Sequence, residues 1–205
     1  FEYKRKTDDV YTVIENGTSS PFTLTGLTPS AQYDIRAKAL CSETSESVYV
    51  NKSFVTPSVN LPIIYVDVDA DGLRDGSSWE NAIDDLNSAL FMAQKIKQDH
   101  EAYPDIWVAA GTYYGDGTST NAFRMVEGVN VYGGFAGTET SLQQRDYETN
   151  ITILDGQGSQ RVLYQDKVYT ESTATVWDGI TIQNGGGAYN GAGAYILEYG
   201  TLRNC

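Results

Sequence analysis

Four aspartates have the spacing most suggestive of chemistry. Asp67, Asp69 and Asp71 alternate with other residues ahead of a glycine, as in the first half of a calcium-binding loop, and Asp75 follows closely. Such a loop is closed by a bidentate Glu at its twelfth position, which here is Ser78. Two interpretations remain open: the four carboxylates bind calcium, or the turn only leads from a strand into a helix.

Tyrosines form the second candidate group. They crowd the second half of the chain, which contains Tyr113, Tyr114, Tyr132, Tyr164, Tyr169, Tyr189, Tyr195 and Tyr199. Aromatic rings exposed on a flat side offer apolar faces on which sugar rings can stack. We take Tyr113, Tyr114 and Tyr189 as the candidate glycan-binding residues; the alternative is that most of these rings pack inside the fold.

Catalytic constellations are not evident in the sequence. His100 has no evident partner, and the basic residues of the second half are not set beside an acidic cluster. Arg145 and Asp146 are predicted to form a local ion pair at a turn. We therefore expect the chain itself to be non-catalytic.

The composition narrows the possible partners and the fold class of the protein. Over 205 residues the net charge is −13, which disfavours nucleic acid and anionic membrane surfaces as partners. No apolar run approaches the roughly 18 residues of a membrane-spanning helix. The 15 Tyr and 20 Gly favour strands and tight turns, so the sequence predicts an all-β protein.

A change in charge marks a domain boundary. Residues 1–60 carry 6 basic and 7 acidic side chains, whereas residues 61–205 carry 8 and 20. Two prolines and small polar residues lie at this step. We expect a first domain over 1–57, a linker over 58–62 and a second domain over 63–205.

The first domain alternates apolar and polar residues with period two, which predicts antiparallel strands. The stretches 24–29, 33–39 and 53–57 resemble the last strands of a fibronectin type III domain. The resemblance covers about the last five strands and implies a partial sandwich. It also implies that the Tyr33 hydroxyl bonds back to the backbone at a corner.

Short apolar runs recur in the second domain. The steps between Val108, Val131, Ile153, Ile180 and Leu202 are 23, 22, 27 and 22 residues. Runs this short, separated by Gly, Asn and Asp turns, predict stacked β-coils in a solenoid. Asn184 and Asn204 each closely follow such a run, and as repeated asparagines at equivalent turns they are predicted to hydrogen-bond along the stack.

A helix is predicted over 79–98, where it would cap the open end of the solenoid. Ser77 and Glu80 form a capping box, and Ile83, Leu86 and Leu90 follow at helical spacing. An open strand edge invites aggregation, so a cap of this kind is expected.

The second domain resembles β-helix regions of surface proteins from Bacteroidetes-type bacteria. The resemblance is carried by stretches 64–67, 75–82, 105–113, 131–140, 145–148 and 152–156. It implies the N-terminal coils of a right-handed parallel β-helix of the pectate lyase-like fold, in a secreted or cell-surface protein. Because Phe1 and Cys205 each lie inside an apparent strand, we expect the chain to be a piece of a longer protein.

Three functions are consistent with this architecture. The first is adhesion or glycan binding, with a polysaccharide or a cell-surface glycan as the partner. The second is a polysaccharide lyase or glycoside hydrolase whose active coils lie beyond this chain. The third is a structural stalk. An exposed stripe of aromatic residues would favour binding.

Overall fold

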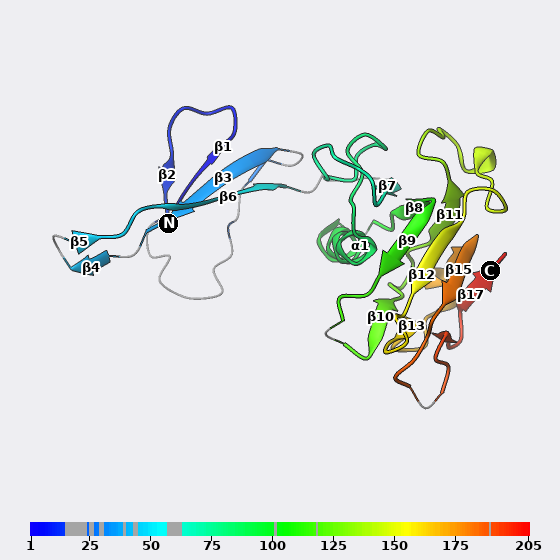
Figure 1. The fold of residues 1–205 in the computed structure, drawn as a ribbon. Coiled ribbons are helices and arrows are strands. Elements are labelled where there is room, and N and C mark those ends of the chain that lie inside the picture. The colour runs from blue at the N-terminus through cyan, green and yellow to red at the C-terminus, as the bar shows by residue number, and fades with distance from the viewer. Residues whose placement is uncertain are drawn as a thin grey trace. The chain divides into compact units, whose positions relative to one another are not determined.

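The computed structural model describes residues 1–14, 24, 27–28, 31–38, 40–42, 45–56, 63–100, 102–117, 119–188 and 190–205. The chain divides into two compact units, Phe1–Val59 (unit 1) and Asn60–Cys205 (unit 2). In this described part the protein is mostly β with one α-helix, which confirms the all-β prediction at that level (Figure 1).

Unit 1 contains an antiparallel sheet with the strand order β2-β1-β3-β6. Its described strands are β1 (Glu2–Arg5), β2 (Thr12–Val13), β3 (Gln32–Ala37), β4 (Leu40–Ser42), β5 (Ser45–Glu46) and β6 (Val50–Val55). Tyr33 is buried, and its ring stacks on Phe54 at 5.8 Å. The Tyr33 hydroxyl accepts a hydrogen bond from the backbone N–H of Thr28 at 3.0 Å, as expected from the sequence.

Unit 2 is built on parallel strands. Its described elements are β7 (Ile63–Val66), α1 (Leu86–His100), β8 (Asp105–Ala109), β9 (Gly111–Tyr114), β10 (Asn121–Arg124), β11 (Val131–Phe135), η1 (Leu142–Gln144), β12 (Thr152–Asp155), β13 (Arg161–Tyr164), η2 (Glu171–Thr173), β14 (Thr175–Asp178), β15 (Ile180–Gln183), β16 (Ala194–Tyr195) and β17 (Gly200–Arg203). The sheet orders are β17-β14-β11-β8-β7, β15-β12-β9 and β10-β13-β16.

From β8 onward the chain visits these sheets in strict rotation. β8, β9 and β10 lie in three different sheets, and β11, β12 and β13 then add one strand to each in the same order. The next circuit, β14 to β16, repeats the order, and β17 begins another. The corner between β14 and β15 is Gly179, at φ +73°, where a Cβ atom would lie 3.0 Å from the Gly133 carbonyl oxygen.

The repeat spacing predicted from sequence is wrong. In the observed register Ile106, Val131, Trp177 and Leu202 are successive neighbours in one sheet, separated by 25, 46 and 25 residues. Ile153 lies in the β9–β12–β15 sheet instead. The middle circuit, β11 to β13, is longer than the others because residues 136–151 and 165–174 form long connections before β12 and β14. The predicted steps were nearly constant only because they compared strands that lie in different sheets.

The core of unit 2 lies inside the three sheets. Phe123, Leu154, Leu163 and Trp177 are fully buried and belong to one apolar cluster. Leu90 and its apolar neighbours on α1 join the same cluster, so the helix packs on the core of the sheets.

The edge of the β17-β14-β11-β8-β7 sheet at β7 is covered by the segment leading into α1, and α1 itself packs on β7 and β8. Ile83 forms a bridge to Val66 at the edge of β7. The helix begins at Leu86, later than the predicted residue 79, and Asp85 caps it by accepting the Ser88 backbone N–H at 2.8 Å. The predicted capping box at Ser77 was wrong because residues 77–81 form bends and a turn, in which the Ala82 N–H donates to the Trp79 carbonyl at 3.2 Å, and Ile83 then bridges to Val66 before the helix begins.

Asparagines at the turns do bond along the stack, to aspartates of the preceding circuit. Asn184 follows β15 and donates to Asp155 at 2.8 Å, and Asn204 follows β17 and donates to Asp178 at 2.8 Å. Both asparagines have positive φ, which Asn tolerates better than most residues. These side chains hold the turns of successive circuits together.

Candidate functional site

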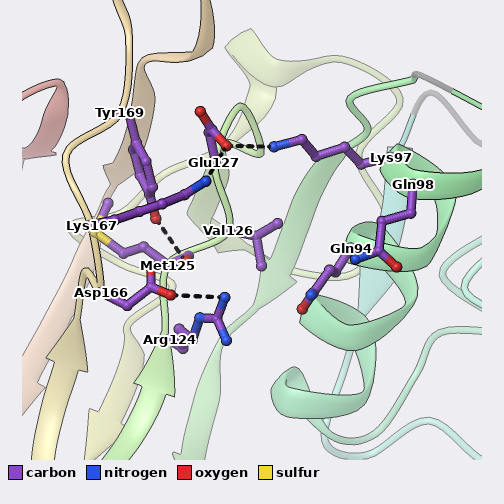
Figure 2. Close-up of a pocket in the computed structure, with 10 residues that line it drawn as sticks. All are labelled: Gln94, Lys97, Gln98, Arg124, Met125, Val126, Glu127, Asp166, Lys167 and Tyr169. Atoms are coloured by element: carbon purple, nitrogen blue, oxygen red, sulfur yellow. Dashed lines mark hydrogen bonds and ion pairs between the residues drawn. The ribbon is translucent and has the colours of Figure 1, made fainter.

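A pocket of about 250 Å³ lies between α1 and the loops that follow β10 and β13 (Figure 2). The helix contributes Gln94, Lys97 and Gln98, whose i, i+3 and i+4 spacing places them on one face. This volume is below the roughly 300–1,000 Å³ of pockets that enclose drug-sized ligands, so it suits one small group or sugar unit.

The opposite wall is made by two neighbouring loops. Arg124 and Tyr164 are paired in the parallel β10–β13 ladder, so the chain leaves both strands side by side. The buried Tyr169 hydroxyl donates to the Met125 carbonyl at 2.8 Å and ties one loop to the other. Burial raises the pKa of Tyr169, so this hydroxyl keeps its proton.

Glu127 forms ion pairs with two lysines at one end of the pocket. Its Oε2 accepts hydrogen bonds from Lys97 and Lys167, each at 2.9 Å, and its Oε1 accepts one from Thr173 at 2.8 Å. The bonds from Lys167 and Lys97 lower the pKa of Glu127 to about 2. The carboxylate therefore stays ionised at physiological pH and holds both ammonium groups in place.

The pocket carries a net positive charge in an acidic chain. Arg124 pairs with Asp166 at 2.9 Å, and its side chain is 55% exposed. Three cations, Lys97, Arg124 and Lys167, thus face two carboxylates, whereas the chain as a whole has a net charge of −13.

A shallower hollow of about 140 Å³ extends the pocket along α1. Gln94, Arg124 and Val126 line both, and Asn87, Leu90 and Phe91 line the extension. Phe91 is 67% exposed, so an apolar ring lies beside the polar end. We call the two together the α1 groove.

A second feature, here called the tyrosine face, adjoins the groove. It consists of Tyr164, Tyr195 and Arg161 on the outer side of the β10–β13–β16 sheet. The tyrosines are in register and their rings stack at 5.8 Å, while the Arg161 guanidinium lies 5.2 Å from each ring centre. Arg124 continues the same row on β10 and also lines the groove.

Arg161 is held by neutral groups. It donates to the carbonyls of Gly191 at 3.0 Å and Asn190 at 2.7 Å, and to Asn121 Oδ1 at 2.9 Å. Within the described ranges it has no carboxylate partner, so its positive charge is balanced by no acidic side chain there.

The candidate tyrosines are not brought together. Tyr113 is buried, donates to the Ala109 carbonyl at 3.2 Å and has its pKa raised by burial, so its ring faces the core. Tyr114 is 53% exposed but lies on β9, in another sheet from the tyrosine face. Tyr189 lies outside the described residues.

The aspartates of the predicted calcium loop make local contacts. Asp67 accepts the backbone N–H of Asp69 at 3.0 Å, and the buried Asp75 accepts that of Ser77 at 2.9 Å. Asp71 is exposed. Across the described residues, which include all four aspartates, no group of three or more His, Cys, Asp or Glu is placed to hold a metal ion. These contacts favour the interpretation as a turn.

Sequence reasoning missed the α1 groove. The spacing of Gln94, Lys97 and Gln98 was available as a signal once a helix was predicted. Glu127 and Lys167 carried no such signal, because they meet only through the pairing of β10 with β13.

Glu127 should make stability depend on pH. Its pKa is lowered from 4.5 to about 2, so the stabilisation is complete above pH 4.5 and is lost as the pH falls toward 2. Glu127→Gln is expected to lower the unfolding free energy by about 1–2 kcal/mol at pH 7.

The difference between wild type and this variant should shrink between pH 4.5 and 2. Urea unfolding followed by tryptophan fluorescence measures it, with Glu171→Gln, at an exposed glutamate, as the control. A difference that stays constant across this range would contradict the role of the lysine contacts.

The described residues define a β-rich protein. In its second unit, one α-helix packs against the core of parallel sheets, and a cationic groove lies along that helix. Comparisons with protein-family models, curated proteins and solved structures found no match. Among the described residues, no helix is long and apolar enough to cross a membrane.

Proposed function

We propose that this chain belongs to a secreted or cell-surface protein that binds glycans, in an adhesion role, without cleaving them. The observation that carries the proposal is the tyrosine face, where two stacked rings and an arginine lie on the outside of a parallel sheet. Stacked aromatic rings suit the apolar faces of sugars, and the guanidinium supplies hydrogen-bond donors for hydroxyl groups.

The same proposal extends to the fold. We assign unit 2 to the N-terminal coils of a right-handed parallel β-helix capped by α1, because its strands visit three parallel sheets in rotation. We assign unit 1 to a partial fibronectin type III-like domain. The antiparallel order β2-β1-β3-β6 and the hydrogen bond of the Tyr33 hydroxyl support that assignment.

Replacing Tyr195 tests the glycan-binding proposal. Tyr195→Ala removes one ring of the stacked pair, and we expect it to weaken binding to a responsive polysaccharide by roughly tenfold. Titration calorimetry of the whole chain against neutral and acidic polysaccharides measures the change, with and without calcium.

Tyr114→Ala is the matched comparison, because Tyr114 is also exposed but lies on another sheet. Loss of binding with Tyr114→Ala alone would move the site to the β9–β12–β15 sheet. Release of new chain ends during the incubation would favour a lyase or hydrolase instead. No binding to any polysaccharide in the panel would oppose the proposal and leave the structural stalk.

A further inference from the structure

We infer that the α1 groove binds the acidic group of a charged glycan, such as the carboxylate of a uronic acid or a sulfate ester. The inference rests on the proposed glycan binding and adds the class of sugar that the chain selects. It assigns recognition of the charge to Lys97, Lys167 and Arg124 and recognition of the sugar ring to the neighbouring tyrosine face.

The cations of the groove retain donor capacity. Lys97 and Lys167 each give one hydrogen bond to Glu127, and an ammonium group has three N–H bonds. Arg124 pairs with Asp166 through Nη2 and is more than half exposed. An oxyanion entering the groove could therefore accept charge-assisted hydrogen bonds without displacing the existing pairs.

Neutral donors face the same space. Gln94 and Gln98 line the pocket from α1, as Figure 2 shows. Within the described residues neither side-chain amide has a hydrogen-bond partner, so both are available to a ligand. Because each amide offers donors and an acceptor, they suit an oxyanion and the hydroxyl groups beside it.

The charge balance favours an anion at this place in unit 2. The three cations and two carboxylates of the groove leave one net positive charge, in a chain whose net charge is −13. The Debye length is about 8 Å at physiological ionic strength, so most of the repulsion from distant acidic residues is screened. Contacts within the groove then decide which ligands bind.

The groove and the tyrosine face form one continuous surface. Arg124 lines the groove and is in register with Tyr164, which is in turn in register with Tyr195. Neighbouring strands are roughly 4.8 Å apart, so these three side chains span about 10 Å, which is the length of two sugar units. A glycan could place its charged group beside Arg124 and rest its next ring on Tyr164.

The test compares charged and neutral forms of one glycan on the whole chain. Oligogalacturonate and its neutral methyl ester form one pair, and dextran sulfate and dextran form the other. We expect each acidic form to bind roughly tenfold more tightly than its neutral partner. The pair with the larger ratio identifies the oxyanion as carboxylate or sulfate.

The double variant Lys97→Gln/Lys167→Gln should abolish that preference and leave binding of the neutral forms unchanged within roughly twofold. Glutamine can still donate to Glu127, and Lys167→Gln alone, at a 59% exposed side chain, covers the case in which the double variant is unstable. Lys95→Gln is the matched control, since it removes the same charge from α1 outside the groove.

Failure of the charged-glycan inference can be distinguished from failure of the glycan-binding proposal. Equal binding of acidic and neutral forms by the wild type, or a preference that survives the double variant, would overturn the charged-glycan inference and leave glycan binding standing. Binding of neither form, in a chain that is folded by circular dichroism, would overturn both.

Discussion

Asp178→Ala is expected to destabilise unit 2 by roughly 3–5 kcal/mol, because it leaves a buried guanidinium without its partner. Arg145 Nη2 lies 2.9 Å from Asp178 Oδ1, and the two side chains are only 11% and 4% exposed. Arg145 also donates to the carbonyls of Gly133 and Asp178, each at 3.2 Å. The ion pair therefore ties the inserted residues 136–151 to the end of β14.

Asp166→Ala is the matched control for this prediction. Asp166 pairs with Arg124 at the same 2.9 Å distance, but that arginine is 55% exposed, so we expect a loss of at most about 1 kcal/mol. Urea unfolding of both variants measures the two costs. Equal losses would mean that burial does not strengthen the Arg145–Asp178 pair.

Trp177→Ala is the second large prediction, with an expected cost of roughly 3–5 kcal/mol from lost burial and the cavity that remains. Trp177 is fully buried in the core cluster, paired in register with Val131 on one side and Leu202 on the other. Its side chain therefore lies in the core between the side chains of Val131 and Leu202, on the middle one of three successive strands.

The variant Trp177→Phe separates volume from polarity. The indole N–H of Trp177 is buried without a partner among the described residues, so phenylalanine removes an unsatisfied donor while keeping most of the ring. We expect a cost of about 1–2 kcal/mol for this change. Trp79 and Trp107 remain in unit 2 to report its unfolding by fluorescence. A larger loss with Phe than with Ala would contradict the cavity argument.

The Asp178 and Trp177 variants should change stability without changing the affinity of the folded protein for glycan. Trp177 and Asp178 are not among the residues that line the α1 groove or form the tyrosine face, so the folded fraction of each variant should keep the wild-type affinity for glycan. Tyr195→Ala on the tyrosine face should do the opposite, changing affinity at nearly constant stability. Calorimetry beside denaturant unfolding separates the two kinds of effect.

Local pattern alone predicted several features correctly. The alternation around Tyr33 predicted a half-buried strand, and Tyr33 is buried in it. The hydrogen bond from the Thr28 N–H to the Tyr33 hydroxyl was implied by the fibronectin type III resemblance and not by the alternation. Asn184 and Asn204 were predicted to bond along a stack from equivalent turns. Each does bond to an aspartate of the preceding circuit, but the two turns are not equivalent, because β15 and β17 lie in different sheets. The helix after residue 80 was also predicted, although its first turn was placed too early.

Features that depend on distant partners were not predictable in the same way. Arg145 was expected to pair with its neighbour Asp146, but it pairs with Asp178, while Asp146 accepts the backbone N–H of Glu148 at 3.1 Å. Tyr113 and Tyr114 were equal candidates by sequence, yet one is buried and the other exposed because adjacent residues of β9 point to opposite faces.

The sequence by itself determined which residues form short strands, where the charge changes along the chain and that a helix lies ahead of the parallel strands. These properties are local, since they depend on side-chain periodicity and turn residues within a few positions. Only the tertiary structure decided which strands are neighbours, because parallel pairing joins residues 25 to 46 positions apart and tolerates inserted loops. The α1 groove and the tyrosine face follow from that register: Arg124, Tyr164 and Tyr195 become one row only after three circuits are stacked.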